Sequence, residues 1–206
     1  ETCRKLPWHP DARPRCLCHG FNLDLGSSDH KQKGFLGSDK RPLRNVDLVF
    51  DVECFPWPLA TETVDRLLAS HLLEHVKPWL MIELMDEMWR VMKADSQAYI
   101  IVPHGDSFGF RQDPTHVGMF NEATFGYYDP KHPSGLYHVY RPKPWHIARL
   151  HWSPVANIEA VLEPIKEAPH AVRAGRGRAS TDHPPVPEGR DVDRAHGAGE
   201  EAATSL

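Results

Sequence analysis

The order of strand-like and helix-like segments between residues 20 and 166 constrains the fold more than any other feature of this chain. The segments with strand character are short and largely apolar: residues 21–25, 35–39, 46–51, 65–70, 97–103, 145–152 and 157–165. Residues 78–92 instead carry apolar side chains at helical spacing, and they begin with a proline, which suits a first helical turn. Strands that alternate with helices and close in a hairpin, here through Ser153-Pro154, predict a mostly parallel α/β sheet with an antiparallel edge.

Composition divides the 206 residues into three parts. Residues 1–19 are rich in proline, arginine and cysteine without periodicity, so we expect an irregular lead-in there. Residues 20–166 are expected to form one folded domain. Residues 167–206 have no aromatic side chain and many alanines, glycines, prolines and arginines. Such a segment cannot bury enough apolar surface to offset the entropy of ordering, so we expect a disordered tail.

Charge and hydropathy bear on two classes of partner, nucleic acids and membranes. The formal net charge of -4 gives no reason to expect a nucleic-acid partner, and the short basic run at residues 173–178 is followed by acidic residues, as in a solvated tail. No apolar run reaches the ~18–20 residues needed to cross a bilayer, and the N-terminal residues lack an apolar signal core. We therefore expect a cytoplasmic protein without a membrane partner. The sequence does not indicate an oligomeric state.

Three cysteines near the N-terminus raise the question of a zinc cluster. Cys16 and Cys18 are separated by one residue, whereas zinc knuckles use a two-residue spacing, and Cys3 does not complete a second pair. Reduced thiols are ordinary in cytosolic proteins. We expect thiols without a metal in this region.

The most specific local feature is the segment Leu23–Asp29, in which a strand runs into Gly26-Ser27-Ser28. A turn of small residues lets the backbone approach a ligand closely. An acidic residue at the end of the next strand, Asp39, can then bind both hydroxyls of a ribose, and Asp51 at the end of the third strand is placed for the adenine edge. Ser28 stands where the G-x-G-x-x-G fingerprint has its second glycine, which argues against NAD and for a ligand without a pyrophosphate. The alternative is an ordinary strand–turn–strand unit with surface aspartates.

Residues 71–75 (His-Leu-Leu-Glu-His) match H-x-x-E-H, the inverted zinc-peptidase motif. On a helix, His71 and His75 would share a face and could hold zinc beside Glu74. That enzyme class needs a third ligand on a long helical scaffold, whereas this motif directly follows a short strand. The alternative is that Leu72 and Leu73 pack in the core while the polar side chains brace the start of a helix.

The loop after the fifth strand contains two imidazoles and two carboxylates within residues 104–116. Ligands of open α/β sheets bind beyond the carboxyl ends of the strands, where this loop begins. Histidine titrates near neutral pH, so His104 or His116 is predicted to accept a proton from a substrate hydroxyl or amine, with Asp113 orienting His116. The alternative is that these groups only hydrogen-bond the loop into shape.

Seven short motifs follow one another along the segment from about Phe21 to Ile165. They are L-D-L-G-S-S, G-F-L-G-S-D, V-D-L-V-F-D-V-E-C-F-P-W-P, A-S-H-L-L-E-H-V, E-M-W-R-V-M-K, Y-I-I-V-P-H and Q-D-P-T-H-V-G-M-F. In this order and spacing they resemble the class I, S-adenosylmethionine-dependent methyltransferases of the ubiquinone/menaquinone-biosynthesis type, particularly small bacterial and phage-borne members. The resemblance implies a three-layer Rossmann-like α/β sandwich with a seven-stranded, mostly parallel sheet and a terminal antiparallel hairpin.

The resemblance also implies roles for individual residues. It places the turn from Asp24 to Ser28 against the methionine part of the cofactor, Asp39 on the ribose hydroxyls, and Asp51 with Val52 at the adenine. Ser70 and His71, just past the fourth strand, would border the methyl-transfer pocket.

Two positions depart from the family pattern. The usual glycine-x-glycine is Gly26-Ser27-Ser28 here, and the usual proline-glycine-glycine before the fifth strand is Ala94-Asp95-Ser96. Serine is small enough for the first site, so we expect cofactor binding to survive. The second change falls in a turn remote from the cofactor and should affect packing more than chemistry.

The activity that the resemblance implies is methyl transfer from S-adenosylmethionine to a small-molecule or saccharide acceptor, without a bound metal. Methyl transfer is an in-line displacement that depends largely on positioning, so a general base is optional. Two alternatives remain. One is a catalytically silent S-adenosylmethionine-binding module, favoured by the altered glycines, and the other is a zinc hydrolase that uses His71, Glu74 and His75.

Overall fold

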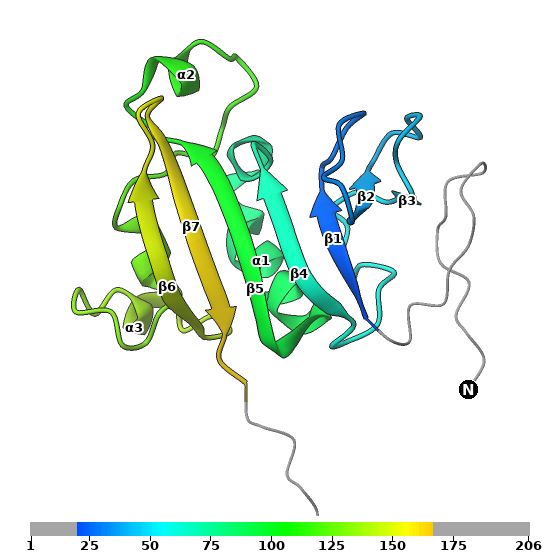
Figure 1. Cartoon of the computed structure of the whole chain (residues 1–206). Helices are drawn as coiled ribbons and strands as arrows, with labels where there is room; N and C mark the ends of the chain where they lie inside the picture. Colours follow the sequence, from blue (N-terminus) through cyan, green and yellow to red (C-terminus); the bar gives the residue numbers. More distant parts are fainter. Residues whose placement is uncertain (1–19, 167–206) are drawn as a thin grey trace, which may run out of the picture. The chain divides into compact units, whose positions relative to one another are not determined.

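The computed structural model describes residues 20–166, which form a seven-stranded sheet in the order β3-β2-β1-β4-β5-β7-β6 (Figure 1). The expected lead-in and tail, the N-terminal cysteines and the basic run at residues 173–178 lie outside the described residues. The strands are β1 (Phe21–Leu25), β2 (Leu36–Asp39), β3 (Leu48–Val49), β4 (Val64–Ser70), β5 (Met92–Pro103), β6 (Trp145–Trp152) and β7 (Asn157–Pro164).

The strand directions confirm the predicted sheet. β1 lies between β2 and β4 and is parallel to both, with Leu23 opposite Leu36 and Leu67. β4 is parallel to β5, whereas β7 runs antiparallel between β5 and β6, as its reversed arrow in Figure 1 shows. A mostly parallel sheet that ends in an antiparallel hairpin is therefore the framework of the protein.

β5 begins five residues before the predicted strand at residues 97–103. Two residues along β4, from Val64 to Arg66, correspond to five along β5, from Met92 to Gln97. Residues 93–96 therefore bulge out of the ladder, and the Ser96 hydroxyl closes this bulge with a 2.5 Å hydrogen bond to the carbonyl of Lys93. The segment Ala94-Asp95-Ser96, expected as a turn, lies in this irregular stretch.

Helix α1 (Met81–Val91) packs against the sheet with its apolar face and is preceded by one 3-10 turn, η2 (Pro78–Leu80). Leu84, Met88 and Val91 are fully buried, and the burial of each such side chain contributes about 1.5–3 kcal/mol. The other short helices are η1 (Leu73–His75), α2 (Phe108–Arg111), η3 (Thr124–Tyr127) and α3 (Tyr137–Tyr140). Within residues 20–166, no helix combines the length and the apolar composition needed to span a membrane.

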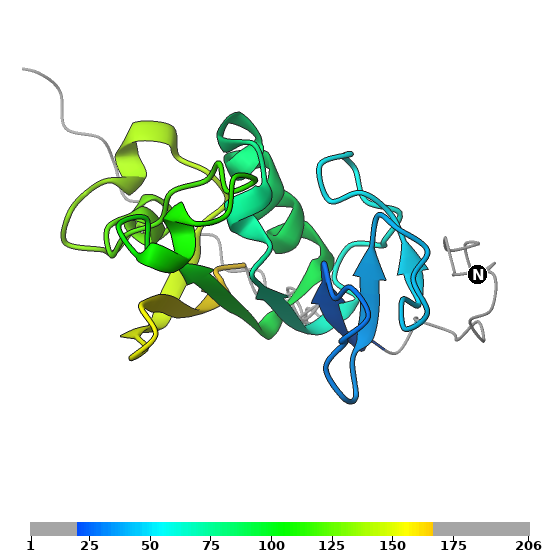
Figure 2. The same ribbon diagram turned by 90° about the horizontal axis from the view of Figure 1, so that it is seen from above.

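The helices α1 and α3 lie on the same side of the sheet, whereas the β1–β2 connection passes on the other side as a loop (Figure 2). Neither this connection (residues 26–35) nor residues 40–47 between β2 and β3 contains a helix. Parallel strands are usually joined by a dozen or more residues when the crossover is helical. These two connections are too short for that, so residues 20–166 do not form the second helical layer that the resemblance implies. Leu68, Tyr99 and Val161 are accordingly only half-buried on the uncovered face.

Candidate cofactor site

A cavity of about 800 Å³ lies beyond the carboxyl ends of β1, β2, β3 and β4. Cavities of a few hundred to a thousand Å³ are typical of sites for small ligands and cofactors. The strand order reverses between β1 and β4, and ligands of open α/β sheets bind at such a reversal. The cavity lining includes six of the predicted site residues: Gly26, Ser28, Asp39, Asp51, Val52 and His71.

The turn after β1 approaches the cavity with its backbone. Gly26 has a φ of +65°, and a Cβ atom at this position would lie 2.7 Å from Cδ1 of Leu72, another lining residue. Ser28 has a φ of 49°, so a serine adopts here the left-handed conformation that glycine usually supplies. The substitution of serine for the family's second glycine thus leaves the turn intact.

Asp24 and Ser27 stabilise this turn through hydrogen bonds and do not line the cavity. The Asp24 carboxylate accepts a 2.7 Å hydrogen bond from the backbone N–H of Gln32, and burial raises the pKa of Asp24. The backbone N–H of Ser27 donates to the carbonyl of Ser38 on β2. Both predicted residues therefore shape the turn through contacts within the fold.

Asp39, at the end of β2, is buried at the cavity wall and is held by Arg41. One carboxylate oxygen accepts hydrogen bonds from the backbone N–H of Arg41 at 2.9 Å and from its Nε at 3.1 Å, and the other accepts from its Nη2 at 3.3 Å. Burial raises the pKa of Asp39, but the hydrogen bonds from Arg41 outweigh it and hold the pKa below the usual range. Asp39 is thus a carboxylate, and its partner Arg41 is a lining residue that the sequence did not single out.

Asp51 and Val52, which the resemblance assigns to the adenine, form part of the cavity wall just beyond β3. The Asp51 carboxylate accepts a 3.0 Å hydrogen bond from the backbone N–H of Glu53, which fixes this turn. Phe50, also in the lining, packs on Trp57 with ring centroids 5.7 Å apart. Sequence reasoning missed Phe50 because an aromatic residue that ends a strand is more often core.

The H-x-x-E-H segment after β4 does not form the helix on which its two histidines would share a face. His71 has a φ of 52°, and only Leu73–His75 form a short 3-10 helix. His71 and His75 therefore do not share a helical face. Instead, Nδ1 of His71 lies 3.1 Å from Oε1 of the buried Glu74, a hydrogen bond that raises the pKa of His71 against the opposing effect of partial burial. Ser70, the last residue of β4, is half-buried and is not part of the lining.

The predicted general bases after β5 lie outside this cavity. His104 is buried: its Nδ1 accepts a hydrogen bond from the backbone N–H of Asp106, and its ring packs on Trp152 at 4.4 Å. His116 lies near Asp113, with 3.8 Å between Nε2 and Oδ2, but the hydrogen bond of its ring goes to the carbonyl of Phe110. Thr115 and Val117 of this loop line the cavity, whereas His116 between them does not.

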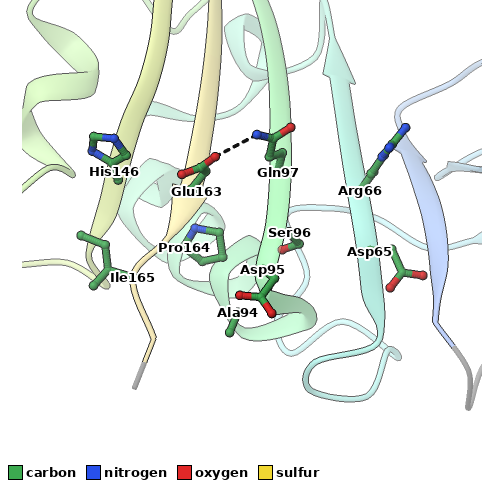
Figure 3. A pocket seen from close by; sticks show the side chains of 10 residues that line it. All are labelled: Asp65, Arg66, Ala94, Asp95, Ser96, Gln97, His146, Glu163, Pro164 and Ile165. Atoms are coloured by element: carbon green, nitrogen blue, oxygen red, sulfur yellow. Dashed lines mark hydrogen bonds between the residues drawn. The ribbon is translucent and has the colours of Figure 1, made fainter. Parts of the chain in front are cut away.

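A second cavity, of about 470 Å³, lies near the amino end of β4 and the bulge of β5, remote from the strand ends described above (Figure 3). Charged side chains border it, and Gln97 donates a 2.8 Å hydrogen bond to Glu163 across two of its strands. Its polar groups come from the end of the sheet opposite to the Gly26 turn. This hollow is therefore not the predicted cofactor site.

No protein-family model matches the chain, and no curated protein sequence matches it. Solved structures do resemble it. A SAM-dependent methyltransferase from Archaeoglobus fulgidus is 15% identical, with the match covering 76% of this chain and 88% of that chain at a TM-score of 0.51. A chain of the Haloferax volcanii complex between the Trm112 methyltransferase activator and a protein described as a methyltransferase is 12% identical. That match covers 72% of this chain and 84% of the other, also at a TM-score of 0.51.

These identities are too low to carry over an activity, and what the similarity shows is the fold. Both matches cover more than two thirds of this chain at a TM-score just above 0.5. This chain has the Rossmann-like α/β fold of the class I methyltransferases.

Proposed function

We propose that this chain binds S-adenosylmethionine at the carboxyl ends of β1 to β4 and transfers its methyl group to a small-molecule or saccharide acceptor. The observation that carries the proposal is the meeting of Gly26, Asp39 and Asp51 in the lining of one 800 Å³ cavity. These residues lie at the carboxyl ends of three different strands, and each was assigned to the same ligand from the sequence. The motif similarity to ubiquinone/menaquinone-type methyltransferases supports the same reaction.

The lining fits the parts of this cofactor. The turn at Gly26 leaves room for backbone contact with the amino-acid part, since a Cβ atom there would meet Leu72. Asp39 offers a carboxylate to the two ribose hydroxyls, provided that the largely exposed Arg41 side chain moves aside. Phe50 and Val52 offer apolar surface for the adenine, with Asp51 beside them. When bound, S-adenosylmethionine supplies a methyl group on a positively charged sulfonium.

His71, which the resemblance places at the border of the methyl-transfer pocket, is in the lining of this cavity. Its Nδ1 is held by Glu74, as a carboxylate orients the imidazole in many general bases. Its Nε2 lies 3.4 Å from Nδ2 of Asn157, a long contact that an acceptor hydroxyl or amine would replace when it gives up its proton. His104 and the Asp113–His116 pair would act only on an acceptor that extends beyond the cavity. We therefore propose His71 as the first candidate for proton transfer.

Isothermal titration calorimetry with S-adenosylmethionine and S-adenosylhomocysteine tests the proposal. We expect both nucleosides to bind one site on the full chain, and we expect NADH not to bind. A screen of candidate metabolites for release of S-adenosylhomocysteine then tests turnover. Binding without turnover on any acceptor would indicate a silent binding module, and absence of binding would refute the proposal.

A further inference from the structure

Three potential metal ligands converge beside the cavity. One ligand atom from each of Glu74, His75 and His116 lies within 4.8 Å of the others. The two imidazole rings are also in contact, with centroids 4.7 Å apart. The residues come from two segments, the η1 turn after β4 and the loop after β5, so the chain fold and not a local motif brings them together.

The Glu74 carboxylate has an oxygen that needs a partner. Glu74 is completely buried, and its Oε1 is 3.1 Å from Nδ1 of His71. Among the residues that the structure describes, its Oε2 has no hydrogen-bond partner. An unpaired buried carboxylate oxygen is costly, and such groups in folded proteins usually bind an ion or a water molecule.

The hydrogen bonds of the two histidines leave one lone pair free on each ring. Nδ1 of His116 is 2.9 Å from the carbonyl of Phe110, which can only accept, so Nδ1 carries the proton. Nδ1 of His75 is 3.0 Å from Oγ1 of Thr115, whose own proton goes to Asp113 at 2.7 Å. His75 is therefore the donor in that contact. In the neutral form both rings present an unprotonated Nε2, as metal-binding histidines do when their other nitrogen is held. Nε2 of His116 is 3.8 Å from Oδ2 of Asp113, which is too far for a hydrogen bond.

The backbone holds the two segments together. The N–H groups of Val117 and Gly118 both donate to the carbonyl of Glu74, at 2.8 and 2.9 Å. A Cβ atom at Gly118 would lie 3.0 Å from the carbonyl of Leu73, so the loop approaches η1 closely. The ligands thus need side-chain adjustment and no change of fold to converge.

We propose that Glu74, His75 and His116 form a binding site for a divalent transition metal of the zinc type. Two imidazole nitrogens and one carboxylate oxygen suit Zn²⁺ and its neighbours rather than Mg²⁺ or Ca²⁺, which prefer oxygen ligands. Bonds of about 2.0–2.2 Å require the three atoms to draw closer than they are here. Three protein ligands leave a fourth position for water or a substrate atom.

The site adjoins the proposed cofactor cavity, because His75 and Thr115 belong to the cavity lining. Resting on the proposed function, the metal would bind an oxygen or nitrogen atom of the methyl acceptor at its fourth position. This ligand set differs from the H-x-x-E-H motif, because His71 holds Glu74 and does not take part. Sequence analysis led us to expect no metal, because the H-x-x-E-H segment lacked the third ligand and the long helical scaffold of its enzyme class. It did not connect His116 with residues 71–75.

The test is a calorimetric titration of the full, metal-free chain with ZnCl₂ in the absence of nucleoside. We expect binding of Zn²⁺ that is weakened by about tenfold or more in His75→Ala and in His116→Gln. The His75 side chain is exposed, so its removal should leave the fold intact, as circular dichroism would verify. Glu74→Gln keeps the shape of the buried side chain and should weaken binding similarly. His30→Ala, an exposed histidine of the β1–β2 connection, is the matched control and should bind as the wild type does.

Cobalt spectroscopy separates this site from the N-terminal cysteines. Co²⁺ bound to nitrogen and oxygen ligands gives no thiolate charge-transfer band, and replacing Cys3, Cys16 and Cys18 by serine should leave the spectrum unchanged. Zinc affinity equal to that of the wild type in both His75→Ala and His116→Gln would overturn the proposal, as would a thiolate band. Binding of S-adenosylhomocysteine, measured separately in metal-free buffer, tests the proposed function independently.

Discussion

The carboxylate of Asp39 accepts three hydrogen bonds from Arg41, two of them from the guanidinium. Asp39 is buried, whereas the Arg41 side chain is 59% exposed. The guanidinium therefore has solvent to move into, while the carboxylate stays at the cavity wall. A ribose that binds Asp39 must displace the two guanidinium hydrogen bonds and can leave the backbone one in place.

Arg41→Met should raise the pKa of Asp39, because the two guanidinium hydrogen bonds that oppose the effect of burial are lost while the backbone hydrogen bond remains. A carbon-detected NMR titration of the Asp39 carboxyl group measures this change directly. We also expect the variant to bind S-adenosylhomocysteine at least as tightly as the wild type, because nothing needs to be displaced. Arg44→Met, at an exposed arginine three residues further along the chain, should change neither quantity. A large loss of affinity in Arg41→Met alone would mean that the guanidinium itself contacts the ligand.

The same pair predicts the sign of one pH effect. The pKa of Asp39 in the folded protein is lower than the value of about 3.9 in an unfolded chain. Its contribution to stability is therefore complete above about pH 4 and disappears as the pH falls through the lowered pKa. Chemical denaturation between pH 2 and 7 should show a smaller acid loss of stability in Asp39→Asn than in the wild type. An equal acid loss in both proteins would contradict this account of Asp39.

Gly26→Ala and Gly34→Ala separate backbone strain from cavity filling. Both glycines have positive φ, +65° and +85°, and the left-handed conformation costs about 1–2 kcal/mol for other residues. An added Cβ meets Leu72 at Gly26 but has nothing within 4 Å at Gly34. Both variants should lose stability in thermal unfolding, and Gly26→Ala alone should also lose affinity for S-adenosylhomocysteine. Equal affinities in the two variants would show that the Gly26 turn does not contact the cofactor.

His71→Ala should lower turnover on the methyl acceptor by about 10²–10⁴, the range for loss of a general base. Cofactor affinity should change little, because His71 would face the acceptor. His104→Ala is the comparison: its Nδ1 is already bonded to Asp106 and its ring packs on Trp152, so we expect a loss of stability with near-normal turnover. If His104→Ala were inactive and His71→Ala active, the general base would be His104, in the loop after β5, and not His71.

Much of the sheet could be predicted from the sequence. Residues 21–25 and 145–152 were predicted as strands with the bounds that β1 and β6 have in the structure. The third strand was predicted over residues 46–51 but is only Leu48–Val49, since it lies at the sheet edge with one neighbour. The predicted helix at residues 78–92 begins later, at Met81, because Pro78–Leu80 form a 3-10 turn. Local patterns thus indicate the type of an element better than its ends.

The site residues that lie at strand ends could be predicted from the sequence. The contacts that depend on how loops pack against one another could not. Asp39 and Asp51 lie at or just beyond strand ends, so the order of the strands alone brings them to one edge of the sheet. The approach of His116 to Glu74 depends on two backbone hydrogen bonds between η1 and a loop about 40 residues further along the chain. No local pattern encodes that contact. The missing helical layer was unexpected for a related reason, because the resemblance implies helices that these short connections cannot hold.

The most direct test of the central claim is the affinity of the full chain for S-adenosylhomocysteine, measured by calorimetry for the wild type and for Asp39→Asn. We expect the wild type to bind and Asp39→Asn to lose about 1.5–3 kcal/mol, the usual value of hydrogen bonds to a charged group. Asp95→Asn, which changes an exposed aspartate at the second cavity, should bind as the wild type does. Equal affinity of Asp39→Asn and the wild type, with both folded, would contradict the assignment of this cavity to the adenosyl cofactor.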